Sequence, residues 1–428
     1  MARPGVPGSS IPGVWAAAVP GRTVADAQAG ALRFTAAILF AALILQRFGL
    51  PLGGKAFSLV GPIGLGLAAW GVLGGTLAFD RGRLAAYCAL AACAVLGLAW
   101  HALSPAGFGG SGANLQSLAQ FLLLTSFACL TFAEPVDERR FFREVNRWFA
   151  IIAAAGVLQF VLQFVGVRIF SFTGIVPGVL LFEFGYNLVI PTGIGDTLKS
   201  NGFFLIEPSV FSQVMALALI IEVVAFRRVA FLCLCVAGLL TSFAGTGWIV
   251  LGSFVAAAGL GLGWRGLAIA TGLVLVVAVL FGVVSTFAPD VYGAFAQRLD
   301  EISRPGTSGH RRFITPFWLL DDTLTSTPSA ALLGLGSGVS ERLTMPYAYD
   351  VNTPIKIELD YGFPALLAYV LLFVLGRKSP VQGAILVPAA VMFFITGSYT
   401  QFPPMLFLVL LLTSVARLRT DQAAPASR

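Results

Sequence analysis

The sequence predicts an all-α polytopic membrane protein, and three observations support this fold class. Of the 428 residues, 57% are hydrophobic and only 11% are charged, a balance that water-soluble domains of this size do not have. The mean hydropathy is +0.87. The apolar residues also fall into twelve segments, and a helix satisfies its own backbone hydrogen bonds inside hydrocarbon.

The twelve predicted spans are apolar segments separated by charged, glycine-rich or proline-rich stretches. They occupy residues 33–50, 56–78, 84–102, 114–133, 148–167, 208–226, 229–244, 247–264, 266–286, 357–376, 381–397 and 402–416. The stretch 229–264 is too long for one span, and Gly245-Thr246-Gly247 divides it into two short helices joined by a tight turn.

The ends of the chain differ in composition from this apolar region. Residues 1–30 are rich in proline, glycine and alanine and have no uninterrupted apolar core, so we expect a disordered tail and not a signal peptide. Residues 31–416 then form a single transmembrane domain, and residues 417–428 form a second tail. The five cysteines lie in apolar segments, where they act as small packed side chains.

The positive-inside rule gives the orientation. With the N-terminus in the cytoplasm, the inner connections hold eleven lysines and arginines, and the short outer connections hold only Lys55. Both termini are therefore predicted to be cytoplasmic. The long connections 168–207 and 287–356 then form two large periplasmic loops. A pI near 9.4 reflects this topology and anionic lipid, so we expect no nucleic-acid partner.

The first long loop ends in a segment that combines a cation, a glycine turn and a carboxylate. Lys199 precedes Gly202, and Glu207 stands directly before Pro208, which suits the first turn of a helix. A helix start favours bound anions. The alternative is an ordinary lysine followed by a glutamate that only caps the helix.

The second long loop carries adjacent Arg311 and Arg312, followed by an amphipathic run over residues 313–324 that contains Trp318. Paired guanidinium groups suit bidentate binding of phosphate or pyrophosphate. Acidic residues of the same loop offset its cations, so an internal ion-pair network and a solvated basic turn are alternatives. The Gly334-Leu335-Gly336-Ser337-Gly338 segment predicts either an anion cradle or a plain turn.

The second loop ends in a polar segment that enters a predicted span. Lys356, Glu358 and Asp360 lie near the membrane boundary, where ionisable groups line an aqueous cavity or pair with each other. Carboxylates in such places can act as bases. The alternative is a structural pair between Lys356 and Asp360 at i and i+4. Two histidines are too few for a histidine metal site.

These segments, in this order, resemble the O-antigen polymerase and ligase superfamily of bacterial inner membranes, which contains Wzy-type polymerases and WaaL-type ligases. The resemblance covers most of residues 195–375. It is carried by Lys199 with Gly202 to Pro208, Ser242 to Gly247, Arg311 or Arg312 with Trp318, Gly334-Leu335-Gly336, and Asn352 with Asp360 and Gly362. Ligases have a histidine before this asparagine, where the chain has Val351, and an arginine is usual at Lys199. These departures favour a polymerase of O-antigen, capsule or exopolysaccharide.

The resemblance implies a GT-C-like, metal-independent glycosyltransferase without cofactors. It would join repeat units linked to undecaprenyl pyrophosphate at the periplasmic face of the inner membrane. Its partners would be these lipid-linked glycans, membrane lipid, and a chain-length regulator or export proteins. A ligase is one alternative. A flippase or transporter is another, although nearly charge-free spans and long outer loops disfavour it.

The implied site residues have two roles. The predicted catalytic residues are Glu207, Arg311, Arg312, Asp350 and Asp360. The predicted substrate-binding residues are Lys199, Arg298, Trp318, Tyr349, Asn352, Lys356 and Glu358. The base that activates the acceptor hydroxyl is left open among Glu207, Asp350, Glu358 and Asp360.

Overall fold

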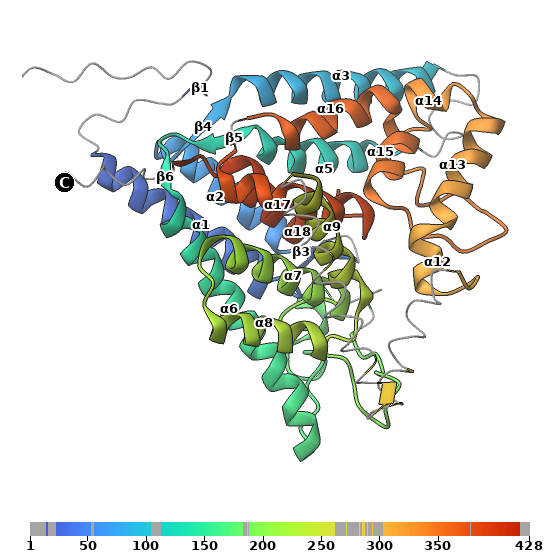
Figure 1. The fold of residues 1–428 in the computed structure, drawn as a ribbon. Helices are drawn as coiled ribbons and strands as arrows, with labels where there is room; N and C mark the ends of the chain where they lie inside the picture. Colours follow the sequence, from blue (N-terminus) through green and yellow to red (C-terminus); the bar gives the residue numbers. More distant parts are fainter. Residues whose placement is uncertain are drawn as a thin grey trace, which may run out of the picture.

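The computed structural model describes residues 14–15, 23–52, 55–103, 113–182, 186, 188–261, 303–376 and 378–419, with isolated residues between 262 and 302. It is mostly helical, with 67% helix and few strands. The long helices form one bundle (Figure 1). The helices α12 to α15 gather at one end of it, and the strands β1, β4, β5 and β6 lie at the other.

The helices of the first half are α1 (Val24–Ile44), α2 (Val60–Leu73), α3 (Arg81–Leu103), α5 (Leu115–Thr125) and α6 (Glu138–Leu162). Helix α1 begins ahead of the predicted boundary at residue 31, because Thr23 and Asp26 form a capping box. It also ends before residue 50. The strands β2 (Gly49–Leu52) and β3 (Lys55–Ser58) form an antiparallel hairpin there, and Pro51 within β2 is incompatible with a helix interior.

The later apolar helices are α7 (Pro208–Ala225), α8 (Val229–Thr241), α9 (Gly245–Gly261), α16 (Phe363–Val374), α17 (Pro380–Ala390) and α18 (Pro403–Leu410). The last two continue as π-helical turns over Val391–Ile395 and Leu411–Val415. Among the described residues, four helices are long and apolar enough to cross a membrane, and seven apolar helices are shorter. The predicted span 266–286 lies outside the described residues, so the count of twelve stays a prediction.

The break between α8 and α9 differs from the predicted one. The chain turns at Phe243, whose φ of 45° is left-handed, and Gly245 already starts α9. Gly247 has a packing role instead, because a Cβ there would lie 2.5 Å from the carbonyl oxygen of Ser212 on α7. This glycine allows α9 to approach α7 closely.

The predicted single span 357–376 is wrong in its first part. Helix α15 (Thr353–Tyr361) ends at Gly362, whose φ of +86° is a left-handed conformation, and α16 begins at Phe363. Lys356, Glu358 and Asp360 therefore lie on a short helix separate from the apolar one. The amphipathic run predicted in the second loop forms α13 (Thr315–Ser326), between α12 (Ser308–Phe313) and α14 (Ala330–Leu333).

The opposite end of the bundle contains short strands, which the all-α expectation omitted. Strands β1 (Val14–Trp15), β4 (Leu77–Asp80) and β5 (Leu130–Phe132) form one sheet, and β6 (Val136–Asp137) pairs with β7 (Leu418–Arg419). Strand pairing supplies hydrogen-bond partners for the backbone N–H and C=O groups of the segments that connect the helices. It also ties the C-terminal segment to the start of α6.

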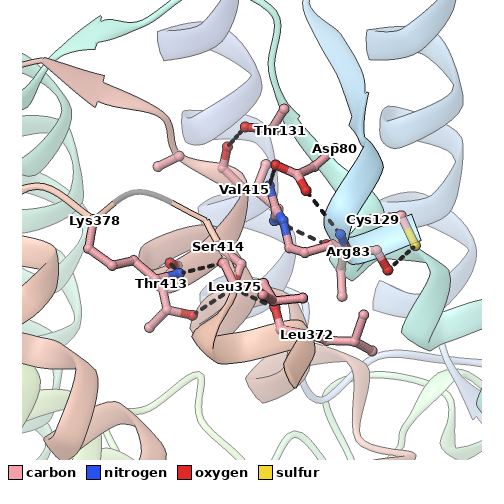
Figure 2. Close-up of polar contacts among 12 residues, drawn as sticks. Asp80, Arg83, Cys129, Thr131, Leu372, Leu375, Lys378, Thr413, Ser414 and Val415 are labelled. Carbon is pink, nitrogen blue, oxygen red and sulfur yellow. Dashed lines mark hydrogen bonds and ion pairs between the residues drawn. The ribbon is translucent and has the colours of Figure 1, made fainter. Parts of the chain in front are cut away.

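Two cations, buried Arg83 and partly buried Lys378, contact the same end of the bundle (Figure 2). The Arg83 guanidinium, 2% exposed, donates to the Ala128 carbonyl at 3.0 Å and lies 3.7 Å from Asp80. Lys378 donates to the carbonyls of Leu375, the C-cap of α16, and of Thr413, in the last turn that continues α18. Burial, with the nearby Arg83 charge, lowers the pKa of Lys378 to about 8. Connections predicted to be cytoplasmic thus contact each other, while the sidedness itself stays a prediction.

Helix α7 lies at the centre of the bundle. Of its 18 residues, 78% are buried, against 22–44% of the most apolar 18-residue stretches of the other three long helices. Small residues of its neighbours allow this: a Cβ at Gly156 of α6 would lie 2.2 Å from the Phe211 ring, and one at Gly238 of α8 would lie 2.9 Å from Met215. The start of α7 is therefore fixed from several sides.

The glycine turn after α14 packs against α15. The amides of Leu335 and Gly336 donate to the carbonyls of Leu359 and Asp360, at 2.6 and 3.2 Å. These amides are thus engaged within the protein, which favours the plain turn over the anion cradle. A Cβ at Gly334, whose φ is +68°, would lie 2.4 Å from the Asp360 backbone.

We predict that Gly334→Ala destabilises the protein by about 1–3 kcal/mol more than Gly306→Ala. Both glycines have positive φ, so both substitutions carry the strain of a left-handed alanine. Nothing lies within 4 Å of a Cβ at Gly306, so only Gly334→Ala adds a backbone clash. The measurement is the thermal unfolding midpoint of each purified variant in detergent; equal midpoints would contradict the close packing of this turn.

Candidate active site

A cavity of about 900 Å³ lies where the second long loop faces the starts of three helices. Its polar wall includes Glu207, Arg311, Arg312, Glu341, Tyr347, Tyr349, Asp350 and Asn352. Its apolar wall includes Ile206, Val210, Ile395, Tyr399 and Phe402. The cavity therefore combines charged loop residues with side chains that belong to the ends of the apolar helices.

Helices α7, α15 and α18 all begin at this cavity. Their N-cap residues Glu207, Asn352 and Phe402 line it, so the positive ends of three helix dipoles point towards it. The Asn352 side chain accepts a hydrogen bond from the Ile355 amide at 3.2 Å, which makes it a cap of α15. Thr353 bonds to the Phe393 carbonyl at 2.9 Å and holds α15 against the end of α17.

The two predicted arginines meet the predicted carboxylates in this cavity. Arg311 pairs with Asp350 at 2.9 Å, and Arg312 lies 3.5 Å from Glu207 and 3.9 Å from Asp350. The Asp350 amide also donates to the Arg311 carbonyl at 3.0 Å. The ion-pair network considered from the sequence is therefore present. The Arg311 and Arg312 side chains are nevertheless 39% and 24% exposed, so an anion in the cavity can reach them.

Glu207 does not cap α7 with its side chain. Its carboxylate accepts a hydrogen bond from the Ser209 hydroxyl at 2.9 Å and faces Arg312, with 14% of the side chain exposed. Glu207 thus occupies the N-cap position of α7, but its carboxylate does not bond to the helix amides as the capping alternative requires. Glu207 belongs to the cavity wall.

A buried clamp fixes the backbone that carries Glu207. Arg47 is 1% exposed and donates to the Leu205 carbonyl at 2.7 and 2.8 Å and to the Phe170 carbonyl at 2.9 Å. The neighbouring Gln46 side chain accepts from the Ile206 amide at 2.8 Å. Sequence reasoning missed this pair, although an arginine inside a predicted span was the available signal.

The predicted cation Lys199 lies away from the cavity lining. Lys199 is 4% exposed and stands beside Ser200 and Asn201, whose side chains both bond to Gln159 of α6 at 2.9 Å. This part of the segment anchors the first loop to α6. The second cation, Arg298, lies outside the described residues.

Lys356 and Asp360 form the structural pair that was the alternative reading. Their side chains, 2% and 0% exposed, lie 3.4 Å apart, and Asp360 also accepts from the Ser340 amide at 2.9 Å. Lys356 additionally lies 2.8 Å from Glu341, which lines the cavity. Burial alone lowers the pKa of Lys356, but the charges of Asp360 and Glu341 outweigh this effect and raise it. Glu358, on the same helix, is not part of the cavity lining.

The predicted aromatic residues occupy the rim. Trp318 is 46% exposed and makes edge contacts with His310 and Tyr347, at ring distances of 5.1 and 5.8 Å. Tyr347 lines the cavity, while Trp318 stands behind it. The Tyr349 hydroxyl donates to the carbonyls of Leu343 and Ser340. Burial and the nearby Glu341 carboxylate raise the pKa of Tyr349, so this hydroxyl stays a donor.

This arrangement can bind a multiply charged anion beside a hydroxyl compound. Two guanidinium groups and three helix starts supply positive potential, and three carboxylates supply proton acceptors. Among the described residues, no group of three or more His, Cys, Asp or Glu is placed to hold a metal ion.

The sequence matches the family model described as WcaD colanic acid polymerase over residues 65–418. The chain belongs to this family. Membership is consistent with the Wzy-type exopolysaccharide polymerase that the sequence resembled, and it implies a glycosyltransferase-type enzyme in a membrane. No curated protein matches the sequence. The matched range contains the whole described cavity wall, whereas the Gln46–Arg47 clamp precedes it.

We predict that Arg47→Met destabilises the protein by several kcal/mol. The substitution leaves the buried Leu205 and Phe170 carbonyls without their donor, and each such loss costs about 1–3 kcal/mol. Arg33→Met is the control, because Arg33 is an exposed residue of α1, the helix that precedes the Arg47 turn, and its effect should stay within about 0.5 kcal/mol. Thermal unfolding in detergent measures both. Similar midpoints for the two variants would show that the clamp carries little stability.

Proposed function

We propose that this protein joins repeat units linked to undecaprenyl pyrophosphate into a bacterial surface polysaccharide. The reaction would take place at the periplasmic face of the inner membrane. The donor is the growing glycan on its lipid carrier, and the acceptor is a sugar hydroxyl of a second lipid-linked unit. A glycosidic bond forms and undecaprenyl pyrophosphate leaves. The name of the family favours an exopolysaccharide of the colanic acid class.

The observation that carries this proposal is the adjacent pair Arg311 and Arg312 in a cavity where three helices begin. Charge develops on the pyrophosphate oxygens as the bond to the sugar breaks. Fixed guanidinium groups and helix dipoles stabilise that charge best if they are in place beforehand. The pyrophosphate would replace Asp350 and Glu207 as the partner of these arginines, and no metal ion would be needed.

The apolar wall of the cavity suits the lipid part of the substrate. Ile206, Val210, Ile395 and Phe402 line it beside the apolar helices α7, α17 and α18. A polyprenyl chain bound there would run along these helices into the bilayer, with its pyrophosphate at their starts. Tyr347, supported by Trp318, would stack on a sugar ring at the polar rim.

A ligase would use the same cavity, but one side chain disfavours it. Val351 lines the cavity between Asp350 and Asn352, at the place where the resembling ligases have a histidine. A valine cannot transfer a proton. We therefore favour the polymerase, with a chain-length regulator or export proteins as proposed partners.

We predict that cells in which Arg311→Ala/Arg312→Ala replaces the natural protein make no polymer and accumulate single repeat units on undecaprenyl pyrophosphate. Loss of both guanidinium groups removes the charges that the leaving group requires. The measurement is the lipid-linked glycan profile by gel and mass spectrometry, beside a strain that lacks the protein. Arg304→Ala is the control, because Arg304 is an exposed arginine of the same loop outside the cavity lining.

The profile also separates the alternatives. Full-length polymer held on the lipid carrier in the strain lacking the protein would identify a ligase. Repeat units trapped on the cytoplasmic face would identify a flippase. Normal polymer in the double variant would contradict the roles given to the two arginines.

A further inference from the structure

Glu341 is a cavity carboxylate that sequence reasoning counted only as an offset to the loop's cations. Its side chain is 50% exposed and lines the cavity, and its Oε1 lies 2.8 Å from the Lys356 ammonium. Lys356 is 2% exposed and also contacts Asp360. A buried lysine is costly unless its charge is compensated. Here one of the two compensating carboxylates, Glu341, lies at the cavity surface.

The backbone on both sides of Glu341 is held as well. The Ser340 amide donates to Asp360 at 2.9 Å, and the Tyr349 hydroxyl donates to the carbonyls of Ser340 and Leu343 at 3.1 and 2.7 Å. A half-exposed glutamate on a loop usually samples several rotamers. At Glu341 the turn and the carboxylate are both fixed in advance, which is what a reacting group requires.

The other two cavity carboxylates have a different electrostatic setting. Glu207 and Asp350 pair with Arg312 and Arg311, and in that group two carboxylates balance two guanidinium groups. Around Lys356, Glu341 and Asp360 share a single ammonium, so negative charge is in excess. The cavity thus has an anion-binding side and an acidic side.

From this geometry we propose that Glu341 is the catalytic carboxylate that binds the acceptor hydroxyl and takes its proton. The inference rests on the proposed polymerase function and divides its cavity into a donor side at Arg311 and Arg312 and an acceptor side at Glu341. Lys356 and Tyr349 are positioning residues, because they act through Glu341.

The proposed step balances in atoms and charge. The acceptor oxygen forms a bond to the anomeric carbon of the donor, and the bond from that carbon to the pyrophosphate oxygen breaks. Undecaprenyl pyrophosphate leaves with the electron pair. The hydroxyl proton passes to the Glu341 carboxylate and then to solvent. In an oxocarbenium-like transition state the attacking hydroxyl becomes acidic as its bond forms, so proton transfer to a positioned carboxylate suffices.

The test uses the full-length protein in nanodiscs with a lipid-linked repeat unit as substrate. We expect Glu341→Gln to lower kcat at least about 100-fold, while Glu341→Asp retains part of it, because general base catalysis contributes about 10²–10⁴-fold. Binding of undecaprenyl pyrophosphate, titrated separately, should change less than about twofold, since the donor side is intact. Asp196→Asn, at an exposed carboxylate of the first loop, should leave kcat unchanged.

Each other outcome counts against the proposal. Polymerisation by Glu341→Gln within about fivefold of the natural protein would show that no proton transfer depends on this residue. A matching loss of undecaprenyl pyrophosphate binding or of the thermal midpoint would assign Glu341 to the donor side or to the fold. If the natural protein itself binds undecaprenyl pyrophosphate but forms no polymer, the proposed function fails, and the role of Glu341 falls with it.

Discussion

The ion pairs among Arg311, Arg312, Asp350 and Glu207 are the interaction on which the described site depends. They join three segments of the chain: the end of the first long loop, the last turn of α12 and the entry to α15. Other contacts hold the second loop against α15, and these ion pairs connect it to the start of α7 as well. Because the side chains are partly exposed, the pairs hold the loop in place and remain open to exchange with another anion.

The network works only because its apolar support is rigid. Glu207 stands at the start of α7, the most deeply buried of the long helices, and Gly156, Gly238 and Gly247 let its neighbours approach it closely. At the other side of Glu207, Gln46 and Arg47 hold the preceding backbone. The Glu207 carboxylate is thus positioned by contacts from the turn after α1, packing from α6 to α9, and charge from α12.

Sequence reasoning singled out four charged residues of the cavity wall, because arginines and carboxylates are rare in so apolar a chain. Arg311, Arg312, Glu207 and Asp350 could be singled out on that ground, and the structure brings all four to one cavity.

Three other features were not predicted, because they depend on tertiary contacts or local backbone conformation and not on the spacing of residues along the chain. The separation of α15 from α16 depends on Gly362, where a positive φ ends the polar helix before the apolar one begins. Glu341 gains its setting from Lys356 and Tyr349, residues 15 and 8 positions away, within a loop that has no regular period. Arg47 was hidden within a predicted span whose true helix ends at Ile44.

A site that neutralises its own arginines has a consequence for repeated turnover. In the proposed reaction, undecaprenyl pyrophosphate must compete with Asp350 and Glu207 for the guanidinium groups, so these carboxylates weaken binding of the donor and of the released product alike. Uniform weakening of this kind does not lower the rate of the bond-breaking step, because only interactions stronger in the transition state than in the ground state affect it. Each cycle ends with a pyrophosphate that has to leave before the next unit enters. Asp350 and Glu207 would favour that departure by re-forming their ion pairs with the arginines. The four side chains that hold the loop over the cavity would therefore also promote release of the pyrophosphate product.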